Sequence, residues 1–209
     1  MVYKNKKELI ERAVAPGKAV LDVGFSGQGV DAASPHWVHN LLRGRTENVW
    51  GIDLEFDETR LPGPKDRYMK ASAEDFSLPQ KFDVIFAGDI IEHLSNPGLF
   101  LDSARRHLAS GGTLVLTTPN AFNLFNIAEK FSKDEPTVNS DHTFYFNKKT
   151  LIKLLEKNGW KADEVSYLYS LELTHKESLK KKLLNGVYWL FARFTPKFVE
   201  TLVIVARPI

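Results

Sequence analysis

Apolar runs of strand length recur along the first 120 residues, with longer amphipathic stretches between them. Most of these runs are apolar at consecutive positions, which is typical of strands that helices cover on both faces. We predict strands at residues 19–23, 49–53, 67–71, 82–87 and 113–118. Strands that alternate with helices favour a parallel, doubly wound sheet.

The segments between these runs predict two helices, at residues 31–43 and 97–108. The second helix has clear end signals. Asn96 is a suitable N-cap, Pro97 suits a first helical turn, and the glycine pair at 111–112 provides a stop.

The pattern changes after residue 120. It predicts a helix at 148–157 that ends near Gly159, a strand at 162–170 and a last strand at 200–208. We expect the two late strands to pair antiparallel at one edge of the sheet. The predicted fold class is therefore α/β, with a doubly wound, mostly parallel, seven-stranded Rossmann-like sheet and an antiparallel last strand.

Composition narrows the class of protein. A length of 209 residues suits one domain, and the net charge of +2 is too small to argue for a nucleic-acid partner. The chain has no cysteine, which excludes disulfides and thiolate metal sites and fits a reducing compartment. Neither a signal peptide nor an apolar run near the roughly 20 residues of a membrane span is present. We expect a cytoplasmic protein that at most touches a membrane.

The stretch AVLDVGFSGQGVD (19–31) runs from apolar residues through Asp22 into Gly24, Gly27 and Gly29. In an open parallel sheet the turn after the first strand approaches the ligand, and missing side chains allow close backbone contact. The alternative is a tight turn with no ligand. Asp53 ends the second strand 24 residues after Gly29, near the spacing at which an acid accepts hydrogen bonds from ribose hydroxyls. The loop has no Lys or Arg and no P-loop follows, so a nucleoside fits better than a triphosphate.

These residues resemble a known family, the class I S-adenosylmethionine-dependent methyltransferases, in the group of ubiquinone-biosynthesis-like (type 11) small-molecule enzymes. The resemblance covers residues 18–160 and returns at the last strand. It rests on VLDVGFSGQG, GIDLE, ASAEDF, FDVIFAGDIIEHLSNPGLFLDSARRHLASGGTLVLTTPN and DHTFYFNKKTLIKLLEKNGW. It implies one methyltransferase domain over residues 1–209, S-adenosylmethionine as cofactor, and methyl transfer to a small-molecule acceptor that is apolar, lipid-linked or a saccharide precursor.

The resemblance also implies which residues bind the cofactor. Asp22 would help to hold the ammonium group, and the backbone of Ala73 would contact the adenine. The full set is Asp22, Gly24, Ser26, Gly27, Gly29, Asp53, Ser72, Ala73, Glu74 and Asp89. The chain departs from the family pattern at two positions: Ser26 stands in the place of the middle glycine of a loop one residue longer, and Ser72 stands where many relatives have Asp.

Few catalytic groups are needed, because methyl transfer from a sulfonium depends mostly on alignment. An oxygen or nitrogen acceptor must still lose a proton, and His93 and His142 are the candidate bases. Each has a structural alternative as a packed or loop-bracing histidine. Asn120 either orients an acceptor or braces its turn, and Glu92 is interpreted as a solvated or loop-bracing carboxylate. No group of His, Asp and Glu has clear metal-ligand spacing, so we predict no metal.

A basic amphipathic helix is predicted at about 175–195. Its apolar face comprises Leu179, Leu183, Val187, Leu190 and Phe194. Two interpretations remain open: peripheral contact with a membrane through residues 176–194, or a lid whose apolar face packs beside the acceptor pocket.

Two other functions remain open. Tyr145 and Lys149 have the Tyr-x-x-x-Lys spacing of short-chain dehydrogenases, and the glycine loop with Asp53 would suit NAD(P) equally well. Against this, the loop lacks that family's Thr-Gly opening. The altered loop also leaves a non-catalytic binding module with a methyltransferase fold as an alternative. The pattern does not predict an oligomeric state.

Overall fold

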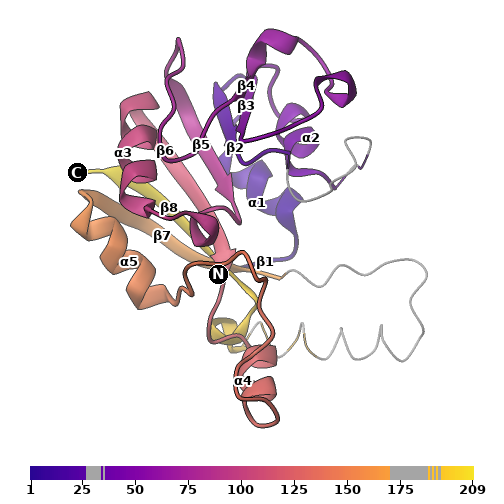
Figure 1. The fold of residues 1–209 in the computed structure, drawn as a ribbon, viewed down its shortest axis with the longest axis vertical. Coiled ribbons are helices and arrows are strands. Elements are labelled where there is room, and N and C mark those ends of the chain that lie inside the picture. Colours follow the sequence, from indigo (N-terminus) through magenta and orange to yellow (C-terminus); the bar gives the residue numbers. More distant parts are fainter. Residues whose placement is uncertain (27–33, 35, 170–187, 189, 191, 193) are drawn as a thin grey trace.

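The computed structural model describes residues 1–26, 34, 36–169, 188, 190, 192 and 194–209, and Figure 1 shows its fold. The strands are β1 Val2–Tyr3, β2 Val20–Val23, β3 Val49–Asp53, β4 Tyr68–Lys70, β5 Phe82–Gly88, β6 Leu108–Pro119, β7 Trp160–Leu168 and β8 Thr201–Pro208. The helices are α1 Lys6–Ala13, α2 Val38–Arg43, α3 Pro97–His107, α4 Leu124–Lys130 and α5 Lys148–Lys157. Four short 3₁₀ helices are η1 Glu58–Arg60, η2 Lys65–Arg67, η3 Ile91–His93 and η4 Pro196–Phe198.

The described strands form one sheet in the order β1-β7-β8-β6-β5-β2-β3-β4. Strand β8 runs antiparallel to both β6 and β7, and the other pairings are parallel. The predicted α/β class, with its mostly parallel sheet and antiparallel last strand, is confirmed. The sheet has one strand more than predicted, because β1 adds two residues alongside β7.

Helices cover both faces of the sheet, α1 and α2 on one side and α3 and α5 on the other (Figure 1). Side chains alternate along each strand, so Val84 and Phe86 of β5 join the core with α1 and α2, while Ile85 and Ala87 join the core with α3 and α5. Burial on both faces explains why these strands read as continuous apolar runs.

The ends of several elements differ from the prediction. The helix expected at 31–43 begins at Val38, and Ser34, His36 and Trp37 are not helical. Ser34 precedes a proline, which disfavours a helical backbone there. Trp37 has an extended backbone, and its indole Nε1 donates to the carbonyl of Phe25 at 2.6 Å. Burial of this ring beside the first strand therefore takes precedence over a longer helix.

The later elements follow the prediction closely. Helix α5 has the predicted bounds, with a capping box formed by Asn147 and Thr150, and Gly159 follows it with φ +70°. Strand β7 begins two residues earlier than predicted, at Trp160. Strand β6 extends back to Leu108, directly after α3.

The predicted basic helix lies mostly outside the described residues. Of its apolar face, Leu190 and Phe194 are described, and their exposures of 53% and 77% do not fit a face packed on the protein. Tyr188 and Ala192 are the buried positions instead. Among the described helices, none is both long and apolar enough to cross a membrane.

Candidate active site

The tip of the first long strand needs a glycine. Gly24 follows β2 with φ +75°, a backbone conformation that other residues adopt at a cost, and its N–H donates to the carbonyl of Ile52 at 2.8 Å. A Cβ at this position would lie only 2.9 Å from Cδ1 of Ile90. Gly24 therefore lets the segment after β5 approach the end of β2. Gly27 and Gly29, also predicted to bind the cofactor, lie outside the described residues.

Asp22, two residues before Gly24 and within β2, is buried and hydrogen-bonded. Its Oδ2 lies 3.0 Å from Nδ1 of His39, and Nε2 of His39 lies 3.1 Å from the hydroxyl of Tyr68. The Tyr68 hydroxyl donates to the carbonyl of Pro62 at 2.7 Å, so it accepts from His39. Burial raises the pKa of Asp22, and the hydrogen bond from His39 offsets part of that rise. Asp22 and His39 therefore form one buried acid–imidazole unit.

Asp53 lies at the carboxyl end of β3. Its Oδ2 accepts from the backbone N–H of Ser26 at 2.9 Å, which connects the tip of β3 to the loop after β2. Its other oxygen, Oδ1, has no hydrogen-bond partner among the described residues and remains available as an acceptor. Ser26 thus contributes its backbone to this corner of the site.

The segment after β4 is held against α3. The hydroxyl of Ser72 accepts from the N–H of Glu74 at 3.2 Å, and Ala73 is nearly buried in the core. The carboxylate of Glu74 accepts from the N–H of Asn96, the N-cap of α3, at 2.8 Å. Glu74 therefore has a structural contact of its own in addition to the predicted place beside adenine.

Asp89, at the end of β5, has φ +54°, in the left-handed region that residues other than glycine rarely adopt. Its Oδ1 accepts from the hydroxyl of Thr117 at 3.0 Å, and its Oδ2 lies 3.2 Å from Nζ of Lys6. Such strained residues cluster at functional sites. Asp89 is thus held firmly at the carboxyl edge, between the tip of β2 and the histidines described next.

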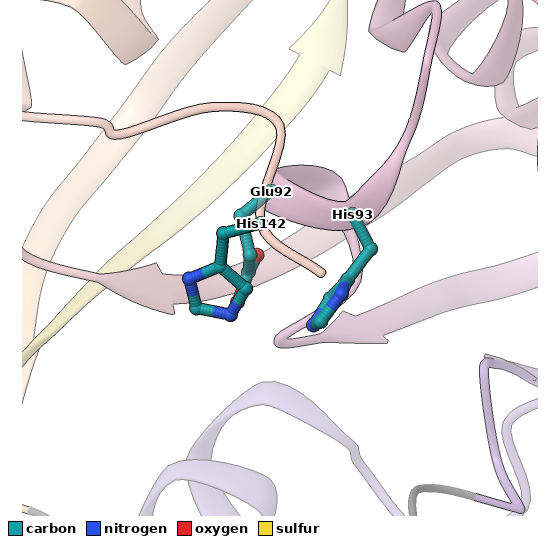
Figure 2. A group of neighbouring side chains, drawn as sticks. All are labelled: Glu92, His93 and His142. Carbon is teal, nitrogen blue, oxygen red and sulfur yellow. The ribbon is translucent and has the colours of Figure 1, made fainter. Parts of the chain in front are cut away.

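Glu92, His93 and His142 come together beyond the carboxyl ends of β5 and β6 (Figure 2). One ligand-type atom from each lies within 4.8 Å of the others, and the two imidazole rings meet edge to face at 4.6 Å between centroids. Oε2 of Glu92 accepts from the hydroxyl of Thr118 at 2.9 Å. Glu92 is 1% exposed, so the solvated interpretation is wrong, whereas its hydrogen bond from Thr118 fits the loop-bracing one.

The environment changes the acid–base properties of this group. Burial, with the Asp89 carboxylate adding to it, raises the pKa of Glu92 to about 7. Burial and the neighbouring His93 lower the pKa of His142, so its imidazole is neutral at neutral pH. Shifts of this kind concentrate at functional sites.

The sequence analysis identified His93 and His142 individually, and the structure places them side by side. It missed His39, because no motif marks a histidine that pairs with an acid 17 positions earlier. Asn120 braces its turn: its side-chain nitrogen donates to the carbonyls of Lys197 and Val199, and its oxygen accepts from the N–H of Phe122.

The fold and this edge define a class of protein: a doubly wound α/β protein with acidic side chains at the carboxyl ends of its central strands, where such folds bind ligands. A model of the methyltransferase domain family matches residues 3–165, and the chain belongs to this family. The ubiquinone biosynthesis O-methyltransferase of Aliivibrio fischeri strain MJ11 is 26% identical over 181 residues, covering 80% of this chain and 74% of that protein. The enzyme of the same name from Dechloromonas aromatica is 27% identical over 188 residues, covering 82% and 77%.

Solved structures agree on the fold. A SAM-dependent methyltransferase from Archaeoglobus fulgidus superposes with a TM-score of 0.62 at 16% identity, covering 96% of this chain and 91% of that one. A SAM-dependent methyltransferase from Aquifex aeolicus superposes with a TM-score of 0.60 at 14% identity, covering 99% of this chain and 90% of that one. The protein is a class I methyltransferase that uses S-adenosylmethionine as its cofactor.

The donor set at the strand ends fits this cofactor. Asp53 presents a carboxylate oxygen to which ribose hydroxyls can donate, and Asp22 places an acid beneath the loop for an ammonium group. When bound, the cofactor supplies an electrophilic methyl group on a sulfonium. The chain's own residues then have to bind the cofactor, align its methyl group with the acceptor and remove one proton from the acceptor.

Proposed function

We propose that this chain methylates a hydroxyl oxygen of a small, apolar acceptor, and that residues 1–209 act as one methyltransferase domain. The observation that carries the proposal is the meeting of Glu92, His93 and His142 beside the cofactor edge. Ile90 approaches Gly24, and the same segment after β5 continues into Glu92 and His93. The proposed cofactor-binding residues therefore lie next to the histidine pair.

The proposed division of labour follows from this arrangement. Asp53 binds the ribose, the Asp22–His39 unit holds the ammonium group, and Ser72, Ala73 and Glu74 bound the adenine. Alignment supplies most of the rate enhancement, because the sulfonium is already an excellent leaving group.

Proton removal is the remaining task. A hydroxyl acceptor is a poor nucleophile while protonated, and a neutral imidazole within reach takes the proton as the new O–C bond forms. His93 and His142 are the groups proposed for this step. The lowered pKa of His142 favours its neutral, proton-accepting form at neutral pH.

Exposed aromatic side chains support an apolar acceptor. Phe144 and Tyr145 follow His142 in the chain, and Phe122 and Phe125 belong to the segment before and within α4; all four are exposed. The relatives named above act in ubiquinone biosynthesis, as their names state, which favours a hydroxylated ring that carries an apolar tail as the acceptor class.

A panel of acceptors tests the proposal. The purified chain is incubated with S-adenosylmethionine and a dihydroxybenzene with a prenyl tail, the same ring without the tail, or a free sugar, and adenosylhomocysteine is measured. We expect the tailed ring to give the highest kcat/KM. Turnover of the sugar alone would overturn the apolar-acceptor proposal.

The dehydrogenase alternative loses its support, since the chain belongs to the methyltransferase domain family. This alternative depends on Tyr145 and Lys149. The hydroxyl of Tyr145 accepts a hydrogen bond from Asn126 at 2.7 Å, and Lys149 lies in the first turn of α5. A thermal shift with NADH but none with adenosylhomocysteine would restore it. The binding-module alternative predicts no adenosylhomocysteine with any acceptor in the panel.

Membrane contact through residues 176–194 also stays a proposal. The exposure of Leu190 and Phe194 supports it, as does the lysine-rich sequence at 180–182. Co-sedimentation with vesicles containing anionic lipid, compared with neutral vesicles, tests it. Equal recovery in the supernatant with both vesicle types would rule it out.

A further inference from the structure

A cavity of about 360 Å³ lies at the edge of the sheet where β4 is the last strand. The end of α2, the start of β3 and the segment that leads into β4 form it, and these elements lie together in Figure 1. Val49, which lines the cavity, begins β3, whereas Asp53 ends it, so the two residues are about 13 Å apart along the strand. The cavity is therefore separate from the cofactor edge.

Two arginines line this cavity, Arg43 at the end of α2 and Arg67 directly before β4. The backbone holds both of them in place. The guanidinium of Arg67 donates to the carbonyl of Glu47, and Nη2 of Arg43 lies so close to Gly63 that a Cβ there would be only 3.1 Å from it. Among the described residues neither guanidinium forms an ion pair with a carboxylate, including that of Glu47, which also lines the cavity. Two positive charges therefore stand in the cavity without a counter-charge from this part of the chain.

Both arginines act on the hydroxyl of Tyr68, which lines the same cavity. Burial raises the pKa of this hydroxyl, and the positive charges of Arg43 and Arg67 both oppose the rise. The hydroxyl itself already bonds with Pro62 and His39, so it does not neutralise the arginines. Like charges on one side of a cavity repel each other, and an anion bound between them would remove that repulsion.

We propose that Arg43 and Arg67 bind the phosphate group of a small phosphate ester. Such a group carries a charge of about −1.5 to −2 at pH 7, which matches two guanidinium groups better than one carboxylate does. Guanidinium groups also donate paired hydrogen bonds to phosphate oxygens. Val49, Pro62 and Pro64 give the cavity an apolar wall, so we expect a short apolar or aromatic group next to the phosphate. S-adenosylmethionine contains no phosphate, so this ligand is distinct from the cofactor.

Hydrogen bonds connect this phosphate site to the cofactor edge. Arg43 lies one turn after His39 on α2, and Arg67 directly precedes Tyr68. The Tyr68 hydroxyl accepts from His39, whose Nδ1 lies 3.0 Å from Oδ2 of Asp22. A ligand that bridges the two arginines holds α2 and β4 together and so favours the bond between His39 and Tyr68. The phosphate ester should therefore tighten adenosylhomocysteine binding, a consequence that rests on the proposed contact of Asp22 with the ammonium group.

Calorimetry with the full wild-type chain tests the site. Phenyl phosphate, inorganic phosphate and benzoate are titrated separately at constant ionic strength. We expect one phenyl phosphate per chain, weaker binding of inorganic phosphate because it lacks the apolar group, and the weakest binding for benzoate because it carries a single charge. Absence of phenyl phosphate binding, or equal binding of benzoate, would overturn the proposal.

Variants locate the site. Arg43→Gln and Arg67→Gln should each weaken phenyl phosphate binding by roughly 10- to 100-fold, and Arg43→Lys, which keeps the charge but not the paired donors, should lose less. Arg43 is exposed, so its variants protect the test against a folding defect. Arg60→Gln is the matched control, because Arg60 lies in the same connection between β3 and β4 but is exposed and pairs with Asp57. If both Gln variants bind phenyl phosphate as the wild type does, the phosphate binds elsewhere and the proposal is wrong.

Titration of adenosylhomocysteine with and without saturating phenyl phosphate tests the connection. We expect phenyl phosphate to lower the Kd by roughly 5-fold or more in the wild type and to leave it unchanged in Tyr68→Phe, which lacks the hydroxyl. A raised Kd would show that phenyl phosphate occupies the cofactor edge and would overturn the proposal. An unchanged Kd in the wild type would refute the connection and leave the phosphate site standing. Binding of phenyl phosphate by a chain that methylates no acceptor in the panel would refute the proposed function and leave this site standing.

Discussion

Oδ2 of Asp22 and Nδ1 of His39 lie 3.0 Å apart in the interior, and the two side chains are 3% and 0% exposed. These two atoms are within hydrogen-bond distance, and the Tyr68 hydroxyl accepts from Nε2 on the far side of the imidazole. The pair connects the acid before the glycine loop to α2 and to β4. His39 therefore acts on the end of β2 through Asp22.

Loss of His39 should therefore affect stability and the cofactor site together. Truncation of one partner leaves the other as a buried polar group without its hydrogen bond, which costs about 1–3 kcal/mol, so His39→Ala should lower the free energy of unfolding by at least this amount. His39→Gln keeps one hydrogen-bonding arm and should lose less. Urea denaturation measures both, and His36→Ala, at an exposed position, should stay within about 0.5 kcal/mol of the wild type. A His39→Ala variant as stable as His36→Ala would contradict the paired arrangement.

The same pair predicts a dependence of stability on pH. Burial raises the pKa of Asp22 above 3.8, so the folded carboxyl binds its proton more tightly than the unfolded one. The stability from Asp22 is fully present below pH 3.8 and is lost as the pH rises through the folded pKa. Asp22→Asn removes this titration. Without cofactor, the free energy of unfolding of the wild type should fall relative to Asp22→Asn as the pH is raised from 4 to 8, and parallel curves would disprove the raised pKa.

The sheet was predictable because buried parallel strands leave a strong apolar signal. All seven predicted strands are present. Their ends shift by one or two residues, except that β6 begins five residues earlier than predicted, at Leu108. Helix α5 has its predicted bounds, with Gly159 as its end signal. The start of α2 was wrong, because the burial of Trp37 against Phe25 is a tertiary effect that no local pattern contains. β1 was missed because two residues are too few for a periodic signal.

The candidate site likewise has a part that the sequence predicts and a part that it does not. Asp22 lies near the end of β2, Gly24 directly follows β2, and Asp53 ends β3, so their place at the carboxyl edge follows from topology alone. The Glu92–His142 contact depends on how the segment after β6 returns to η3, which the bonds from Thr143 to Glu92 and Leu94 determine. A pairing of this kind at long sequence separation cannot be read from one sequence.

Gly24 allows a second test of the cofactor edge, with an internal control. Gly24 and Gly111 share φ +75°, but a Cβ at 111 would meet nothing within 4 Å, whereas one at 24 would meet Ile90. Gly111→Ala should cost about 1–2 kcal/mol from the backbone alone. Gly24→Ala should cost about 1–3 kcal/mol more from overpacking, measured by urea denaturation.

Ile90→Val removes the Cδ1 atom that clashes, so Gly24→Ala should cost less in that background. A double-mutant cycle measures this coupling. Zero coupling between the two positions would show that Ile90 does not constrain the loop.

Asp53 gives the most direct test of cofactor placement. Loss of its carboxylate leaves the ribose hydroxyls without an acceptor, so Asp53→Ala should weaken adenosylhomocysteine binding by about 1–3 kcal/mol in calorimetry, or roughly 5- to 150-fold in Kd. The variant also loses the bond from the N–H of Ser26.

Asp53→Asn separates the two effects, because its amide oxygen keeps an acceptor for Ser26 while the second oxygen is replaced by a donor. Glu55→Ala, two positions later and exposed, is the matched control and should bind as the wild type does. If Asp53→Asn binds as tightly as the wild type while Asp53→Ala does not, Asp53 only shapes the loop, and the sugar is held by another residue.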